Sequence, residues 1–122
     1  MEQFDFHAAT ANPGRSWETI NTGVTQMLLN HDQSTGRRTT LQRWEAGGAN
    51  SQSQPFVHDY VEEIYLVEGD LYDIRLGQGW TAGAYAYRKP GMEHGPFTSE
   101  KGCLMFIVCI PVNKEGQERQ ES

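Results

Sequence analysis

Apolar and polar residues along this chain show little helical periodicity and have the composition of β-strands, and residues 38–45 alternate with the period of two that is typical of a strand. The only stretch compatible with a helix, residues 16–26, contains Thr19, Thr22 and Gly23, which lower helix propensity, so we expect strand there as well. This pattern, together with the turn residues between the segments, predicts strands over residues 24–30, 38–45, 56–67, 71–76, 80–88 and 103–110, the last of them apolar on both faces. Residues typical of turns separate these segments, including a predicted turn at residues 68–70 and another at 77–79.

Roughly seven or eight short strands without a convincing helix predict an all-β fold, a sandwich or barrel, rather than an α/β fold. A length of 122 residues suits one domain. We expect an N-terminal arm over residues 1–16, the β-domain over 17–112 and a polar C-terminal tail over 113–122.

Charge and hydropathy narrow the classes of partner. Sixteen acidic against ten basic residues give a net charge of -6, which repels phosphate backbones and argues against a nucleic-acid partner. The longest apolar run, residues 103–111, is about half of the ~20 residues that a membrane-spanning helix needs. No secretory leader pattern opens the chain, so we expect a cytoplasmic protein without a membrane partner.

The two cysteines, Cys103 and Cys109, are an even number of residues apart in one predicted strand and therefore share one of its faces. Two thiols so placed cannot easily approach to disulfide distance, and we interpret both as reduced core residues. A nucleophilic role is the alternative, but it needs an accessible, electropositive setting, and this strand is almost wholly apolar.

Three residues are candidate metal ligands. His58 and Glu62 are four positions apart, so both side chains point to one face of an extended segment. His94 lies in a loop rich in Pro and Gly that can fix an imidazole beside a strand. Two imidazoles and one carboxylate suit a non-haem Fe(II) centre or a catalytic zinc ion with positions left open. Glu63 competes with Glu62 but points to the opposite face.

These residues also carry a family resemblance. His58, Glu62 and Gly69 resemble the second His, the Glu and the closing Gly of the first cupin motif, and Pro90, Gly91 and His94 approximate the second motif. Residues 62–70 and 90–96 are similar to small single-domain cupins of the ChrR-type and acetylacetone-dioxygenase-like groups. The resemblance implies a double-stranded β-helix, the cupin jelly-roll barrel, commonly dimeric and with a single metal in its mouth.

The chain departs from the cupin pattern at three points. Phe56 stands where the first His of the family's His-x-His pair would be, no residue separates Pro90 from Gly91, and the Asn that ends the second motif is missing. The implied ligand set is therefore His58, Glu62 and His94. The implied cofactor is one divalent metal ion, with Fe(II) favoured and Zn, Mn and Ni as alternatives.

Aromatic residues are candidates for lining a substrate pocket or, alternatively, for ordinary core packing. The candidates are Trp44, Phe56, Tyr85, Tyr87 and Phe106. Arg75 and Arg88 could anchor a substrate carboxylate, although surface placement is the simpler interpretation. Residues 104–110 are apolar on both strand faces, which predicts that a second subunit covers the outer one, as in a homodimer.

We therefore expect a mononuclear-metal enzyme that acts on a small keto, enol or phenolic substrate, with a dioxygenase as one interpretation. A lyase or isomerase, such as a dehydratase or decarboxylase, is the alternative within the same fold. A non-catalytic module that binds a small ligand is the alternative from another class. The residues do not decide among these hypotheses.

Overall fold

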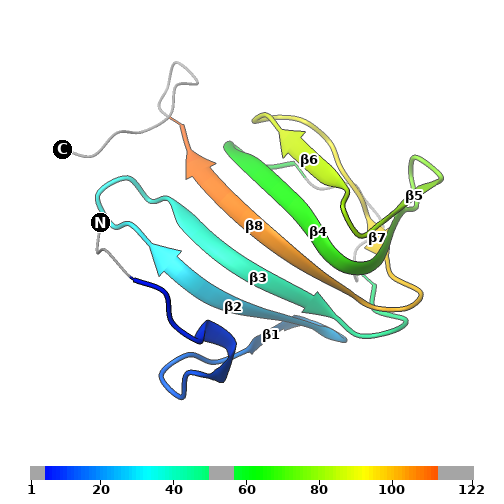
Figure 1. Ribbon diagram of the computed structural model, residues 1–122. Helices are drawn as coiled ribbons and strands as arrows, with labels where there is room; N and C mark the ends of the chain where they lie inside the picture. Colours follow the sequence, from blue (N-terminus) through cyan, green and yellow to red (C-terminus); the bar gives the residue numbers. More distant parts are fainter. Residues whose placement is uncertain (1–4, 50–56, 113–122) are drawn as a thin grey trace.

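Eight antiparallel strands make up the fold in the computed structural model, which describes residues 5–49 and 57–112 (Figure 1). The strands are β1 (Glu18–Asn21), β2 (Val24–His31), β3 (Arg38–Trp44), β4 (Tyr60–Asp73), β5 (Gln78–Thr81), β6 (Tyr85–Arg88), β7 (Phe97–Thr98) and β8 (Cys103–Pro111). A short 3-10 turn, η1 (Ala9–Ala11), precedes them. In this part of the chain, no helix has the length and apolar character needed to cross a membrane.

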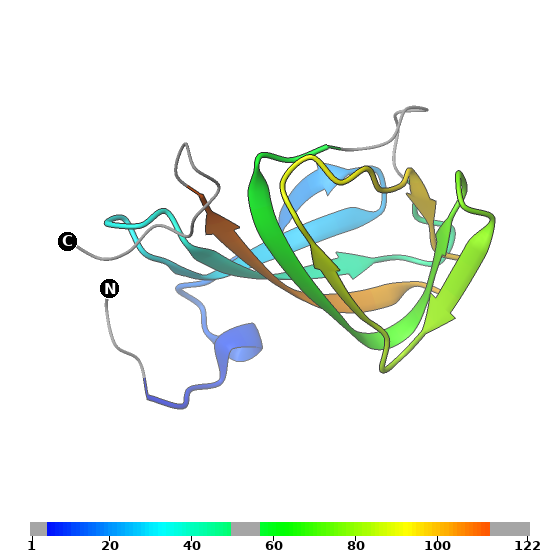
Figure 2. The same cartoon turned by 90° about the horizontal axis from the view of Figure 1, so that it is seen from above.

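The strands follow the order β1-β2-β3-β8-β4-β5, and β6 and β7 also pair with β4. β4 therefore joins two parts of the sheet: its first part pairs with β6 and β8, and its last residues pair with β5 and β7. Viewed from above, the sheet curls around an interior (Figure 2). β2, β3, β8, β4 and β6 all contribute side chains to one cavity there.

Most of the predicted strands are confirmed. The predicted strands at 24–30, 38–45 and 103–110 correspond to β2, β3 and β8. Residues 16–26 contain β1 and the start of β2 and no helix, as expected. Alternation of burial is clear in β8, where Cys103, Met105, Ile107 and Cys109 are buried. Both cysteines are free and belong to the buried core, as predicted.

The predicted turn at residues 68–70 is wrong, because β4 runs without interruption from Tyr60 to Asp73. The strand instead contains a bulge between Leu66 and Glu68, where its register with β8 shifts. Gly69 is needed there for close approach: its φ is +83°, and a Cβ would lie 1.9 Å from the carbonyl oxygen of Gly102.

Two further predictions need correction, and one strand was not predicted at all. Residues 80–88 form two strands rather than one, because a turn at residues 82–83 separates β5 from β6. The turn predicted at 77–79 lies earlier, at residues 74–77, so β4 ends at Asp73 rather than at residue 76. The alternation did not indicate β7, whose two residues are too few to show a period.

Candidate metal centre

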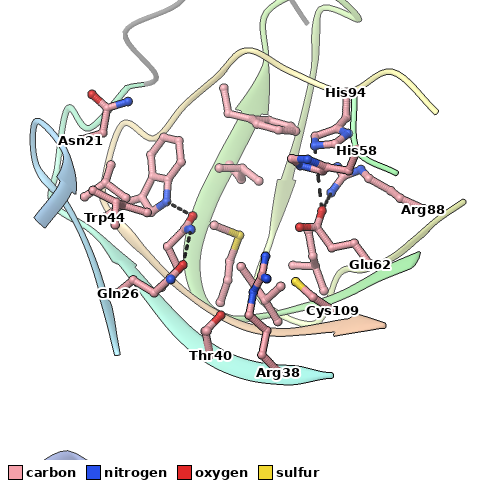
Figure 3. Close-up of a pocket in the computed structure, with 18 of the residues that line it drawn as sticks. Asn21, Gln26, Arg38, Thr40, Trp44, His58, Glu62, Arg88, His94 and Cys109 are labelled. Carbon is pink, nitrogen blue, oxygen red and sulfur yellow. Dashed lines mark hydrogen bonds and ion pairs between the residues drawn. The ribbon is translucent and has the colours of Figure 1, made fainter. Parts of the chain in front are cut away.

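The three predicted ligands converge at one end of the cavity (Figure 3). His58 lies just before β4, Glu62 lies within β4, and His94 lies in the loop between β6 and β7. One potential ligand atom from each residue lies within 4.8 Å of those from the other two. The imidazole rings of His58 and His94 have centroids 4.8 Å apart and are tilted by 47°.

The alternation of β4 selects Glu62 over Glu63. Glu62 is buried, with 8% of its surface exposed, and it lines the cavity. Its Oε1 accepts a hydrogen bond from Nη1 of Arg88 at 3.4 Å, across the β4–β6 pair. Glu63 points to the other face, where it accepts a hydrogen bond from the hydroxyl of the exposed Tyr85. As expected, the carboxylate of Glu62 faces the cavity and that of Glu63 faces the outside.

Hydrogen bonds tie the loop that carries His94 to the segment just before β4 and to the last residue of β4. The backbone N–H of Gly91 donates to the carbonyl of His58 at 2.9 Å, which joins the segments of the two histidines directly. On the other side, the N–H of Gly95 donates to Oδ2 of Asp73 at 3.0 Å. Asp73 is only 1% exposed and also accepts from the N–H of Leu76 at 3.0 Å. These bonds hold His94 from both neighbouring sides, and sequence reasoning missed Asp73.

His94 is set up to offer a neutral nitrogen. Its Nδ1 lies 3.4 Å from the carbonyl oxygen of Met92, which can only accept, so Nδ1 carries the proton. Nε2 then presents its lone pair toward Glu62, whose Oε1 is 3.9 Å away. Burial, with the nearby positive charge of Arg88 as a second cause, lowers the pKa of His94 to about 4. The imidazole is therefore uncharged near neutral pH, as metal binding requires.

The donor set fits a divalent metal ion. Two ligand atoms of one tetrahedral zinc ion, each ~2.0–2.1 Å from it, lie roughly 3.4 Å apart. The ligand atoms here lie within 4.8 Å of one another, so a closure of at most about 1.4 Å by side-chain rotation suffices. Two imidazoles and one carboxylate leave coordination positions free for further ligands. The position of the missing family ligand, Phe56, lies outside the described residues.

The cavity itself has a volume of about 270 Å³, at the small end of the range for ligand sites. Opposite the histidines, Nε1 of Trp44 donates to Oε1 of Gln42 at 2.8 Å, and Nε2 of Gln42 donates to Oε1 of Gln26 at 3.4 Å (Figure 3). Apolar side chains cover the wall between the two ends, namely Val24, Ile64, Leu71, Phe97, Met105 and Ile107.

Of the predicted pocket residues, Trp44 lines this cavity. Tyr85, Tyr87 and Phe106 do not, and the prediction that they line it is corrected, because the strand register turns their side chains to the outer face. They are 60%, 46% and 39% exposed, and Tyr85 borders a separate hollow of about 140 Å³. Phe56 lies outside the described residues.

Of the two candidate arginine anchors, one faces the cavity and the other does not. Arg88 faces the cavity but is paired with Glu62, and its guanidinium packs 5.4 Å from the ring centroid of Phe97. Arg75 is exposed, and its Nη2 donates to the carbonyl of Glu93 at 3.4 Å, away from the cavity. Sequence reasoning missed a third arginine, Arg38, which lines the cavity from β3. Its even spacing from Trp44 on the same strand was the signal that could have found it.

Buried side chains around the ligands are held in their neutral forms. Burial, followed by the nearby Cys109 and Glu62, raises the pKa of Tyr60 to about 12. Burial also raises the pKa of the Cys109 thiol, and it raises that of Cys103 to about 11. Thiols so shifted do not form the thiolate that a nucleophile needs, which supports the packing role for both.

Comparison with known proteins agrees with this architecture. The chain resembles an RmlC-like cupin from Shewanella frigidimarina, at 19% identity and TM-score 0.69 over 94% of this chain and 96% of that chain. An acetylacetone dioxygenase from Acinetobacter johnsonii is 14% identical, with TM-score 0.69 over 100% of this chain and 87% of that chain. The anti-sigma factor ChrR from Rhodobacter sphaeroides, solved in complex with SigE, is 20% identical, with TM-score 0.61 over 76% of this chain and 47% of that chain.

At these identities the likeness concerns the fold, which is the cupin jelly roll. A search of curated protein sequences finds no match. The family model of the ChrR cupin-like domain matches residues 7–113, nearly the whole chain. The chain therefore belongs to the ChrR cupin-like domain family.

Proposed function

We propose that the protein is a mononuclear-metal enzyme that acts on a small organic substrate with keto, enol or phenolic oxygens, by oxygen-dependent cleavage. The observation that carries the proposal is the convergence of His58, Glu62 and His94 at the polar end of one cavity. A neighbour in fold, the acetylacetone dioxygenase, gives this reaction class additional support.

A divalent ion at this site, with Fe(II) favoured, would supply Lewis-acid chemistry and open positions for a substrate oxygen pair and O₂. The protein's own residues would prepare that chemistry. His94 offers an uncharged nitrogen, and Glu62 supplies the single negative charge of the donor set. Tyr60 stays protonated and can donate a hydrogen bond to a substrate oxygen beside His58, on whose ring it stacks at 4.6 Å.

The size and walls of the cavity restrict the substrate. A volume of about 270 Å³ admits a small molecule rather than a polymer segment. Phe97, Ile107 and Met105 give the middle of the cavity an apolar wall, which excludes water from the carbon skeleton of a bound molecule. Trp44 and the glutamines beside it can bind a polar group at the far end.

A lyase or isomerase would use the same ligand set without O₂, by polarising a carbonyl group. One observation favours the non-catalytic alternative: Arg88 already compensates the charge of Glu62, so this carboxylate needs no metal to balance it. A ligand-binding module would need only the cavity and its polar ends.

Metal analysis combined with oxygen uptake separates these functions. We expect purified protein loaded with Fe(II) to hold about one equivalent and to consume O₂ with acetylacetone or a catechol. His94→Ala should lose the metal and the oxygen uptake, whereas His31→Ala, which changes an exposed histidine at the end of β2, should keep both. Metal binding with turnover in the absence of O₂ would favour the lyase. Ligand binding by a protein that takes up no metal would favour the binding module.

We also propose that a second copy of the chain covers the outer face of β8. Tyr65 is paired in register with Phe106 on one side and Tyr85 on the other, and all three are exposed. Contiguous exposed apolar surface of this kind is typical of subunit interfaces. Light scattering should give twice the mass of one chain, and Phe106→Ser should shift the protein to the monomer. A monomeric native protein would contradict the proposal.

A further inference from the structure

Arg38 brings a positive charge into the cavity from the wall opposite Arg88. It begins β3 and pairs in register with Cys109 of β8, which in turn pairs with Glu62 of β4. Arg38, Cys109, Glu62 and Arg88 therefore form one row across four neighbouring strands, all facing the cavity. Figure 3 shows the side chain of Arg38 pointing into the cavity.

The two arginines of this row differ in what neutralises them. Arg88 has Glu62 at 3.4 Å. Within residues 5–49 and 57–112, no carboxylate lies at ion-pair distance from Arg38. Its guanidinium instead lies over the ring of Tyr60, 5.2 Å from the centroid, and Tyr60 itself stacks on His58. Among the described residues, the guanidinium of Arg38 therefore has no carboxylate partner, and it lies one aromatic ring away from a metal ligand.

The surroundings of Arg38 suit an anion that enters from solvent. Beside Arg38, Tyr60 and Cys109 bring a hydroxyl and a thiol but no carboxylate, and the carboxylate of Asp59, which borders the adjoining hollow, lies beyond ion-pair distance. Arg38 also borders an adjoining hollow of about 290 Å³, so its guanidinium lies at the wall of the cavity rather than deep in the core. A guanidinium in this position can bind a carboxylate through two parallel hydrogen bonds.

We propose that the substrate is a small keto acid, whose carboxylate binds Arg38 while its keto oxygen faces His58, Glu62 and His94. The inference rests on the proposed function for the keto oxygen, but the carboxylate site rests on Arg38 alone. It changes the substrate class from a neutral diketone or phenol to a monoanion. The net charge of the chain is -6, so the guanidinium of Arg38, which has no carboxylate partner in the described part of the chain, is a local feature of the cavity wall rather than part of a basic surface.

Two pairs of molecules test the proposal, because each pair differs in one group only. Acetoacetate is acetylacetone with one terminal methyl group replaced by the carboxylate oxygen, and pyruvate is related to 2,3-butanedione in the same way. Calorimetry with the zinc-loaded protein measures binding without oxidation of the ligand. We expect each keto acid to bind about tenfold or more tightly than its diketone.

Variants at two arginines of β3 locate the effect. Arg38→Gln should remove the preference for the keto acids, and Arg38→Lys should keep part of it, because an ammonium retains the charge but not the bidentate geometry. Arg43→Gln is the matched control: Arg43 is on the outer face of the same strand, over the ring of Trp17 at 4.8 Å. It should leave all four affinities unchanged. Thermal unfolding checks that each variant is folded.

The outcomes separate this inference from the proposed function. Equal binding of acid and diketone by the native protein, no binding of either acid, or a preference that survives in Arg38→Gln would each overturn the keto-acid proposal. Zinc binding without any acid preference would leave the metal proposal standing alone. A preference that depends on Arg38 in a protein that takes up no zinc would leave the carboxylate site standing and refute the metal centre.

Discussion

Replacing Glu62 by Gln tests the metal centre most directly, because the neighbouring residue provides a control with the same chemistry. Glu62 and Arg88 have side chains only 10% and 11% exposed, so the substitution leaves a largely buried guanidinium without its negative partner. Breaking a buried ion pair costs about 3–5 kcal/mol. Gln keeps a carbonyl oxygen that can accept the 3.4 Å hydrogen bond from Arg88, so we expect a smaller loss of stability, about 2 kcal/mol, which lowers the melting temperature by roughly 8 °C.

The response to metal gives a second, larger difference. A divalent ion supplied at 100 times its dissociation constant stabilises a folded protein by about 2.7 kcal/mol, or roughly 11 °C here. Glu62→Gln removes the only anionic ligand of the set, so this increment should vanish. Glu63→Gln should keep it in full, and its metal-free melting temperature should lie within about 2 °C of the native value, because Glu63 and its partner Tyr85 are on the solvent face.

Differential scanning fluorimetry with and without ZnCl₂ or Fe(II) under anaerobic conditions measures both effects. A metal-dependent shift that persists in Glu62→Gln, or one that disappears in Glu63→Gln, would refute the assignment of the carboxylate and with it the geometry of the site.

Three further substitutions test the supports of the site. Burial lowers the pKa of His94 from 6.5 to about 4 in the metal-free folded protein, so between these pH values the unfolded chain binds a proton that the folded chain does not. The free energy of unfolding should therefore be constant above pH 6.5 and fall by up to about 3 kcal/mol toward pH 4. Urea unfolding at several pH values should show that the stability of His94→Gln falls less steeply with acid than that of the native protein. Equal slopes for the two proteins would contradict this prediction. Asp73→Asn leaves one acceptor for the N–H groups of Leu76 and Gly95, so we expect the free energy of unfolding to fall by about 1–3 kcal/mol. Because Gly95 is next to His94, zinc titration should also show about 10–100-fold weaker metal binding. Unchanged zinc affinity would show that the loop holds His94 without Asp73. Gly69→Ala brings a Cβ against the carbonyl of Gly102 and should destabilise the protein by about 3 kcal/mol or more in urea unfolding, whereas a native-like midpoint would mean that the bulge can relax.

The ligand set could be predicted from the sequence because its geometry is local. His58 and Glu62 share one extended segment, where parity alone decides that both side chains face the same side. The structure places them as predicted, and the Pro/Gly loop brings His94 to them. Bringing His58 and Glu62 together needs no knowledge of which strands are neighbours, whereas the place of His94, 32 residues further along the chain, was implied by the resemblance to the second cupin motif.

The lining of the cavity could not be predicted in the same way, because it depends on the phase of the alternation. Tyr85 and Tyr87 alternate with Ala86 and Arg88, and composition favours the aromatic face as the buried one. The pairing of Arg88 with Glu62 turns that face outward instead. The phase follows from the register of β6 with the distant strand β4, which no pattern within residues 85–88 contains.

The bulge in β4 explains why a single strand supports the site at two places. Glu62 and Asp73 are an odd number of positions apart, so in an uninterrupted strand their side chains would lie on opposite faces. The register shift between Leu66 and Glu68 adds one residue and reverses the parity, so that Glu62 before it and Leu71 after it both line the cavity. Asp73 then faces the loop and holds Gly95 next to His94. One extra residue in β4 thus lets the strand provide the ligand Glu62 and also position the ligand His94 through Asp73. Deleting that residue would turn Asp73 to the other face, away from the His94 loop, even if every hydrogen bond of the first half of β4 were kept.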